Sequence, residues 1–195
     1  MSVPDTSADF FEAMFRGSSD PWNFAADPYE QFRYNTILRA LEPGPYRHAY
    51  EPGCSVGALT EKLAGICERV DACDFSPSAV AEAEARCKLL PGVSVRVGSL
   101  RHDVTFGQYD LIVLSEIGYY FSLTEWSALL AGMVDRMQPG TVLLASHWLG
   151  SSPDHVLSGD EVHGLLAHPE LKHEHGERHP DAVRGGFRLD RWRRL

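Results

Sequence analysis

The regular alternation of short apolar runs with helical segments constrains the fold of this 195-residue chain more than any other feature. Apolar runs of strand length recur from residue 49 onward, and recognisable helix starts lie between them. Such alternation predicts parallel strands, because a parallel pair needs a long crossover to return the chain. We therefore predict an α/β fold with a Rossmann-like, doubly wound, mainly parallel sheet. The predicted strands cover residues 49–51, 70–74, 93–97, 111–115 and 141–147, and the helices between them cover 57–65, 76–90 and 122–137.

The two ends of the chain carry different patterns. Before the first strand, apolar spacing predicts two helices, the second with Asp27 as its cap and Glu30 as a capping-box acid. After the fifth strand, a capping-box pattern predicts one more helix, and weaker strand signals suit an antiparallel edge hairpin. We expect a single domain over residues 1–195, with a helical segment at 1–46 and an α/β core at 47–195. The helices are expected at 7–17, 28–41 and 158–168, and the hairpin strands at 171–175 and 186–192.

Charge and composition narrow the classes of partner. The chain has 18 Lys and Arg residues against 27 Asp and Glu residues, and its basic residues gather only at Arg191, Arg193 and Arg194. Nucleic acid is therefore not expected as a partner, because phosphate binding needs clustered positive charge. No apolar run approaches the roughly 18 residues of a membrane span, and residues 1–5 lack a basic leader pattern. Since the four cysteines have no disulfide-like spacing, we expect a cytoplasmic protein without a membrane partner.

The turn after the first predicted strand has the composition of a ligand-binding loop. In a doubly wound sheet, ligands lie where the first strand turns into its helix. Gly53 and Gly57 permit a tight turn there, but Ser55 stands where a dinucleotide-binding loop requires glycine. A pyrophosphate must approach the backbone closely at that position, so Ser55 argues against NAD or FAD and favours a ligand without phosphates. The candidate binding residues of this turn are Glu51, Gly53, Cys54, Ser55 and Gly57.

Further candidate binding residues follow the second and third strands. Asp74 ends the second strand, at about the distance from the first strand, roughly 20 residues, expected for an acid that accepts both ribose hydroxyls. Phe75 is placed to lie against an adenine ring, and Ser76 begins the next helix. Ser99 and the Leu100 backbone follow the third strand, where the adenine amino group would fall. These positions together favour an adenosyl ligand.

These motifs resemble those of the class I S-adenosylmethionine (SAM) dependent methyltransferases, whose first motif reads acid-x-Gly-x-Gly-x-Gly. More specifically, the chain is similar to nodulation protein S and its relatives from about residue 21 to residue 192. The segments that carry this similarity are Pro21-Trp22, Tyr29-Glu30, Arg33-Tyr34, Glu51 to Ser55, Ser115-Glu116, Gly118-Tyr119-Tyr120, His147-Trp148 and Leu157 to His163. The resemblance implies a class I methyltransferase fold, with SAM as the methyl donor and S-adenosylhomocysteine as the product.

The resemblance also implies a reaction and further site residues. The best-known members of the family methylate the free amine of a deacetylated chitooligosaccharide, which implies a small amine or a saccharide-type acceptor here. The N-terminal helices are implied to cap the cofactor, with Trp22 and Arg33 near its methionine part. A guanidinium suits the carboxylate of that part, because it forms paired hydrogen bonds. Ser115, within the shared motif after the fourth strand, completes the candidate cofactor-binding set.

Residues at the ends of the fourth and fifth strands are candidates for the acceptor side. Methyl transfer to nitrogen needs alignment and a free lone pair, so an ammonium acceptor must first lose a proton to a carboxylate or an imidazole. Glu116 follows the fourth strand and His147 closes the fifth, and in this topology both strand ends face the same crevice. We predict that Glu116 and His147 orient the acceptor or accept its proton, and that Tyr119 shapes the site. His163 is an additional candidate.

Structural interpretations stay open beside these functional ones. Asp74 also suits the dipole of the next helix, Trp22 suits packing of the N-terminal segment, and His147 suits a buried polar group. The spacing of His173 and His175 suits a solvated edge strand better than a metal site, so no metal is predicted. The alternative functions are an O-methyltransferase, a non-catalytic SAM-binding protein and, less favoured, a nucleotide-cofactor oxidoreductase.

Overall fold

The computed structural model describes residues 6–101 and 105–195, which divide into two compact units. One unit comprises Ser7–His102, and the other comprises Asp103–Leu195 together with the first six residues. Residues 1–5, on which the predicted absence of a leader rests, lie outside the described residues. No helix in the described part of the chain is long and apolar enough to cross a membrane. The single domain over residues 1–195 stays a prediction.

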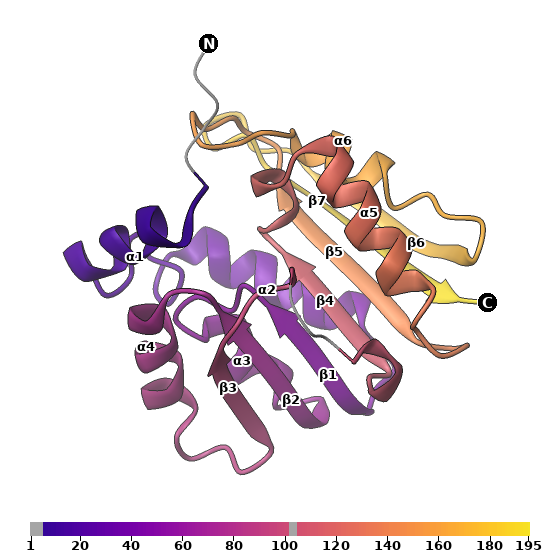
Figure 1. Cartoon of the computed structure of the whole chain (residues 1–195), viewed down its shortest axis with the longest axis horizontal. Coiled ribbons are helices and arrows are strands. Elements are labelled where there is room, and N and C mark those ends of the chain that lie inside the picture. Colours follow the sequence, from indigo (N-terminus) through magenta and orange to yellow (C-terminus); the bar gives the residue numbers. More distant parts are fainter. Residues whose placement is uncertain (1–5, 102–104) are drawn as a thin grey trace. The chain divides into compact units, whose positions relative to one another are not determined.

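The Ser7–His102 unit contains a three-stranded parallel sheet with the strand order β3, β2, β1 (Figure 1). Glu51 pairs with Ala72 near the end of β1, and Asp74 pairs with Val97 at the end of β2. The parallel pairing confirms the prediction for these three strands, and it puts both acids at carboxyl ends. The elements of this unit are α1 (Ala8–Gly17), α2 (Pro28–Ala40), β1 (Tyr46–Pro52), α3 (Ala58–Leu63), β2 (Cys67–Asp74), α4 (Pro77–Cys87) and β3 (Val93–Val97).

Side-chain caps start three helices of this unit where the sequence predicted them. Ser7 and Ser76 each accept the N–H of the third residue after them, at the starts of α1 and α4, and Asp27 accepts the N–H of Tyr29, the second residue after it, at the start of α2. Each cap oxygen satisfies one of the backbone N–H groups that a helix leaves unpaired at its start. Proline follows directly in α2 and α4, where its missing N–H costs nothing.

The second unit contains the strands β4, β5, β7 and β6 in that order. β4 pairs with β5 in parallel, whereas β7 pairs antiparallel with both β5 and β6. This arrangement confirms the predicted antiparallel hairpin, and all residues of β4 are buried. The elements of this unit are β4 (Leu111–Ser115), α5 (Leu123–Val134), β5 (Val142–Trp148), α6 (Gly159–Gly164), β6 (Leu171–His179) and β7 (Phe187–Arg194), with short 3-10 helices at Phe106–Gln108 and Gly118–Tyr120.

The helices of the second unit begin with the predicted capping boxes. Ser122 and Glu125 exchange hydrogen bonds at the start of α5, and Ser158 and Glu161 do so at the start of α6. The α6 helix ends at Gly164 rather than near residue 168, and the chain continues in turns, in which Leu166 and Ala167 donate their N–H groups to the carbonyls three residues before them. Figure 1 shows α6 over the sheet, where it contacts β5 and β7.

Candidate functional site

The turn that follows β1 is held in a left-handed backbone conformation. Gly53, Ser55 and Gly57 have φ angles of 71°, 50° and 73°, and such angles strain a residue with a side chain, such as Ser55. Gly53 donates its N–H to the Cys73 carbonyl at 2.7 Å. A Cβ on Gly57 would lie 3.0 Å from Ala83 of α4. This glycine therefore permits the close packing that the sequence predicted.

Asp74, at the end of β2, ties this turn to the start of α4. Its buried carboxylate accepts the Ser76 N–H on one oxygen and the Ser55 N–H on the other, each at 3.0 Å. Burial raises the pKa of Asp74, against the opposing effect of these hydrogen bonds. The acid thus serves the next helix, as its structural interpretation holds. Each carboxylate oxygen still has a lone pair for a further donor, such as a ribose hydroxyl.

The Ser55 hydroxyl is a buried polar group to which the described residues offer no hydrogen bond. Its oxygen is buried and has no hydrogen-bond partner among residues 6–101 and 105–195. A buried hydroxyl without a partner costs free energy, so an occupied site is the ordinary way to satisfy it. The Ser55 hydroxyl can donate or accept a hydrogen bond, and the Asp74 carboxylate accepts. These two groups fit a polar, uncharged part of a ligand, such as a nucleoside, better than a negatively charged pyrophosphate.

Glu51 supplies a second buried carboxylate, at the end of β1. The Thr60 hydroxyl donates to it at 2.6 Å. Burial raises the pKa of Glu51 to about 7, although the Thr60 bond and the Arg33 charge act in the opposite direction. A carboxyl group poised at this pKa ionises when a cation such as an ammonium group pairs with it. This residue therefore fits the amino group of an amino acid ligand.

Arg33 is buried within the same unit. Its guanidinium donates to Glu30 from Nε at 3.0 Å and from a terminal nitrogen at 2.5 Å. Glu30 thus forms an ion pair instead of the capping box that the sequence predicted, because the guanidinium is the stronger hydrogen-bond donor. The predicted role of Arg33 at the cofactor carboxylate stays a prediction.

The α1 helix is bonded to the start of α4, directly after Asp74. The Glu12 carboxylate accepts the Ser76 hydroxyl at 2.6 Å, the Ser78 hydroxyl at 2.8 Å and the Ser78 N–H at 3.1 Å. These bonds, led by the one from Ser76, lower the pKa of Glu12 to about 2. A carboxylate at a helix N-terminus is also favoured by the helix dipole. The Ser76 hydroxyl, predicted to bind cofactor, is therefore engaged in joining two helices.

Aromatic contacts surround the segment between α1 and α2. Trp22 stacks on Phe24 with ring centroids 5.5 Å apart and meets Phe15 of α1 at the same distance. Phe75 packs edge-on against Phe11 at 5.4 Å. The structural interpretation of Trp22, which fixes its segment to α1, is thus supported, and its contact with a cofactor is left as a prediction.

The side chains of three further predicted binding residues are engaged within the protein. The Cys54 side chain is buried against Ala72 and Ala83 in the core. The Ser99 hydroxyl accepts the N–H of residue 101 at 3.2 Å, and Leu100 is buried. The backbone groups of these residues are what a ligand can contact without disturbing the core.

In the second unit, Glu116 follows β4 in a left-handed conformation with a φ of 58°. Its carboxylate accepts the Trp148 N–H at 2.8 Å and the Tyr119 hydroxyl at 2.5 Å. Its own N–H donates to the Ser146 carbonyl at 3.0 Å, and the buried Ser115 before it pairs with the same residue of β5. The carboxylate is therefore held from the ends of both strands. Backbone strain at a fixed polar group is typical of functional sites.

His155 belongs to this cluster and was missed by the sequence analysis. Its ring stacks on Tyr119 with centroids 3.8 Å apart and an interplanar angle of 15°. Trp148 and Tyr120 meet the same ring edge-on, at 5.8 and 5.5 Å. The Nδ1 atom is buried with no hydrogen-bond partner in the described part of the chain, and burial lowers the pKa of the ring. No local motif marks this residue, because its aromatic contacts come from folding the loop after β5 back onto the turn after β4.

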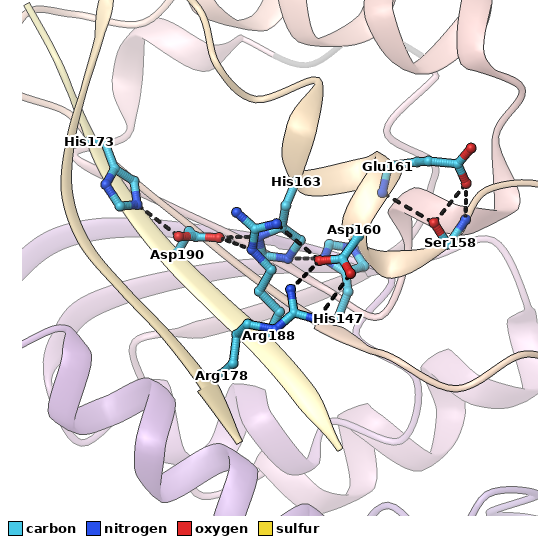
Figure 2. A network of polar contacts seen from close by, with 9 residues as sticks. All are labelled: His147, Ser158, Asp160, Glu161, His163, His173, Arg178, Arg188 and Asp190. Atoms are coloured by element: carbon cyan, nitrogen blue, oxygen red, sulfur yellow. Dashed lines mark hydrogen bonds and ion pairs between the residues drawn. The ribbon is translucent and has the colours of Figure 1, made fainter. Parts of the chain in front are cut away.

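His147 is fully buried, and both of its ring nitrogens are bonded within the protein. The Gly118 N–H donates to Nε2 at 3.0 Å, and Nδ1 lies 3.1 Å from Nε2 of His163. His163 in turn bonds Asp190 at 2.7 Å (Figure 2). No ring nitrogen of His147 is left to receive a proton from a substrate. A proton-accepting role of His147 would require one of these two hydrogen bonds to break, and its predicted role toward the acceptor stays a prediction.

The histidines of the β6–β7 hairpin are paired with carboxylates. His173 bonds Asp190 at 2.7 Å, and Glu177 holds both His175 and His179. No group of three or more His, Cys, Asp or Glu residues in the two described ranges is arranged to hold a metal ion. These contacts support the interpretation of a solvated edge strand.

The two units together have a known fold. A crystal structure of the N-methyltransferase nodulation protein S from Bradyrhizobium japonicum, in complex with S-adenosylhomocysteine, matches 97% of this chain and 99% of its own chain. The TM-score is 0.86 and the sequence identity is 27%. The α/β fold, mainly parallel with an antiparallel edge pair and with a ligand-binding turn after β1, is that of the class I SAM-dependent methyltransferases.

Within that class, the chain belongs to the nodulation protein S family, whose family model matches residues 5–158. Nodulation protein S of Sinorhizobium fredii is 39% identical over 104 residues, which cover 53% of this chain and 48% of the relative. The protein of the same name from Bradyrhizobium diazoefficiens is 32% identical over 139 residues, covering 70% of this chain and 65% of the relative. The chain thus spans about half to two thirds of the length of the curated relatives that it matches.

Proposed function

We propose that this protein is a methyltransferase that uses SAM to methylate an amine nitrogen of a small or amino-sugar acceptor. The observation that carries the proposal is the pair of buried carboxylates, Glu51 and Asp74, around a left-handed turn. The buried Ser55 hydroxyl of this turn has no hydrogen-bond partner within the described part of the chain. Membership of the nodulation protein S family and the similarity to an N-methyltransferase structure support it. When bound, SAM supplies an electrophilic methyl group on a sulfonium.

Each part of the proposed cofactor site has a separate role. Asp74 accepts the ribose hydroxyls, and Glu51 in its ionised form pairs with the ammonium of the methionine part. Backbone groups around Ser99 and Leu100 contact the adenine, beside Phe75. The remaining proposed contacts come from the helical segment and from the strand ends, namely Trp22, Arg33, Gly53, Cys54, Ser55, Gly57, Ser76 and Ser115.

The acceptor side is proposed to lie at Glu116, Tyr119 and His155. The Glu116 carboxylate, already held by the Tyr119 hydroxyl and the Trp148 N–H, keeps lone pairs that accept an N–H of the acceptor. An ammonium acceptor gives up one proton to this carboxylate or to water, which frees the nitrogen lone pair for alkylation. The His155 ring, which is partly exposed and is backed by the stacked ring of the buried Tyr119, offers a wall suited to the apolar face of a sugar.

A reducing compartment, and specifically the cytoplasm, is part of the proposal. None of the four cysteines, which all lie within the described residues, forms a disulfide bond, and three of them are buried. Free buried thiols of this kind are typical of proteins that are kept reduced.

Calorimetric titration tests the cofactor part of the proposal. We expect S-adenosylhomocysteine and SAM to bind and NAD not to bind. Asp74→Ala should weaken S-adenosylhomocysteine binding roughly tenfold or more, because it removes the acceptor of two hydroxyl hydrogen bonds. Asp71→Ala, on the same strand but half exposed, is the matched control. Binding of NAD, with no binding of SAM or S-adenosylhomocysteine, would overturn the proposal.

Mass spectrometry of reaction products tests the acceptor part. Chitooligosaccharides with one free amine should gain a methyl group, and fully N-acetylated oligomers of the same length are the matched control, because an amide nitrogen has no available lone pair. Methylation of both oligomers would place the reaction on a hydroxyl oxygen. Methylation of neither would remove the amino-sugar class and leave the cofactor result to stand by itself.

A further inference from the structure

A line of hydrogen bonds runs through the second unit from the Gly118 backbone to β7. The Gly118 N–H bonds His147 at 3.0 Å, His147 lies 3.1 Å from His163, and His163 lies 2.7 Å from Asp190 Oδ2. The other oxygen of Asp190 lies 2.7 Å from His173, whose side chain is 51% exposed. Figure 2 shows the part from His147 to His173. The line therefore joins the turn after β4 to the exposed side of the hairpin.

The two ends of this line give it one direction. A backbone N–H can only donate, so Nε2 of His147 accepts and the proton of the neutral ring resides on Nδ1. That proton is donated to Nε2 of His163, whose own Nδ1–H is then donated to Asp190. Although burial acts to raise it, hydrogen bonds from His163, His173 and Arg188 lower the pKa of Asp190 to about 2, so the acceptor end is ionised. Both ends thus require the Nδ1–H tautomer in both rings.

Ion pairs fix Asp190 at the acceptor end. Arg188 donates from Nε to Asp190 at 2.6 Å and from a terminal nitrogen to Asp160 at 3.0 Å. Arg178 holds the same Asp160 with two hydrogen bonds. Since Asp160 lies in the first turn of α6, the helix that carries His163, one set of charges holds both Asp190 and the helix (Figure 2).

Gly118 is wedged at the other end of the line. A Cβ there would lie 2.3 Å from Val162 of α6 and 3.0 Å from Trp126 of α5. Gly118 lies two residues after Glu116 and directly before Tyr119. The side chains of Glu116 and Tyr119 are hydrogen-bonded to each other. The hydrogen bond from the Gly118 N–H therefore fixes the turn that presents both side chains.

We propose that Asp190 is a positioning residue for methyl transfer, which acts through His163 and His147 to set the tautomer that holds Gly118 and thereby places Glu116 and Tyr119. The catalytic consequence rests on the proposed function, whereas the tautomers do not. Without the carboxylate, the Nδ1–H of His163 has no acceptor, and only the Gly118 N–H still favours the Nδ1–H form of His147. The Nε2–H forms of both rings then become populated, and in that state the Nε2–H of His147 faces the Gly118 N–H donor, so their hydrogen bond is lost.

Nitrogen-15 NMR of the histidine side chains in the intact chain tests the tautomers directly. We expect His147 and His163 to be protonated on Nδ1 in the wild-type protein. In Asp190→Ala, both rings should populate the Nε2–H form alongside the Nδ1–H form, and the Gly118 amide should exchange with solvent faster. Nε2 protonation of His147 in the wild-type protein would overturn the proposal, whether or not any variant folds.

Two further variants separate the hydrogen-bond acceptor from the charge. Asp190→Asn keeps a carboxamide oxygen toward His163 and Arg188, so the wild-type tautomers should be retained. His173→Gln changes only the exposed end of the line and is the matched control, with tautomers and turnover unchanged. An altered tautomer of His147 in the His173→Gln protein would contradict the proposal, because the tautomers should depend on the Asp190 carboxylate and not on His173.

Kinetics with a methylated acceptor test the catalytic consequence. Asp190→Ala should lower kcat roughly tenfold to a hundredfold, as expected when reacting groups are misplaced. The Kd for S-adenosylhomocysteine should be unchanged, and Asp190→Asn should restore most of kcat. An unchanged kcat in Asp190→Ala, or an equal loss of cofactor binding, would contradict a positioning role. If the wild-type protein methylates no amine, the proposed function fails, while the NMR result still decides the hydrogen-bond line.

Discussion

At the scale of single residues, the pKa of Glu51 makes stability depend on pH. Its pKa is about 7 in the folded protein against a value of 4.5 without burial, so the folded state holds this proton more tightly than the unfolded chain. The resulting stability is fully present below pH 4.5 and is lost as pH rises to about 7, by about 3 kcal/mol at most. Glu51→Gln, which stays neutral, should not show this loss.

Urea unfolding at pH 4.5 and pH 8, without ligand, checks the effect. From pH 4.5 to pH 8, the free energy of unfolding of Glu51→Gln should increase relative to that of the wild-type protein. The difference between the two proteins, rather than either curve, is the relevant quantity, because every other titrating group cancels in it. A difference that is independent of pH would mean that folding does not raise the pKa of Glu51.

The bond between Tyr119 and Glu116 predicts coupled effects on turnover. Tyr119→Phe removes the hydroxyl that holds the carboxylate, so kcat should fall roughly tenfold, with the Kd for S-adenosylhomocysteine unchanged. Glu116→Gln should have a similar effect. In the double variant the losses should be smaller than the product of the two, because both changes break one interaction. Strictly multiplicative effects would show that the two residues act separately.

Local motifs were enough to predict Glu51 and Asp74, since an acid at a strand end before a turn is a feature of neighbouring residues. The partners of Glu12 and His155 come from segments far away in the sequence, and only packing brings them together. The same limit applies to the surroundings of His147. The strand-end position was predictable, but the two bonds that occupy its ring depend on Gly118 and His163.

At the scale of elements, Glu12 predicts a pH-dependent attachment of α1. Its pKa is lowered to about 2 from 4.5, so the stabilisation of the α1–α4 contact is present above pH 4.5 and is lost as pH falls toward 2. Glu12→Gln should increase hydrogen exchange in α1 at neutral pH, because the amide is a weaker acceptor for the Ser76 and Ser78 donors. Asp9→Asn, exposed on the same helix, is the control and should leave exchange unchanged.

Strands and helix starts were predictable at this scale because each depends on a short window of sequence. Apolar runs marked β4 and β5, and Ser158 with Glu161 marked the start of α6. The end of α6 was not predicted, since the helical pattern continues toward residue 168, whereas the hydrogen bonds after Gly164 are those of turns. The strand β6 also extends to His179, beyond the apolar residues, because pairing with β7 stabilises its polar part.

At the scale of the whole molecule, ligand binding should protect the chain unevenly. S-adenosylhomocysteine at a hundred times its Kd should add about 2.7 kcal/mol to the free energy of unfolding. Hydrogen exchange should slow most in residues 51–57 and 74–79, around the two buried carboxylates. The β6–β7 hairpin provides the internal reference, with exchange little changed. Protection confined to the hairpin would contradict the assigned cofactor site.

The position of β7 in the sheet sets the order in which parts of the protein can fold during synthesis. This strand lies between β5 and β6 in space but follows both in the sequence, so the edge that each presents to it stays unpaired until residues 187–194 leave the ribosome. The turn with Glu51 and Asp74 emerges earlier by roughly 5 to 30 seconds at ordinary rates of synthesis. A nascent chain should therefore gain the proposed methyl-donor site first. Asp190 lies on β7, so the proposed geometry for transferring the methyl group to an acceptor is completed only after this strand has been synthesised.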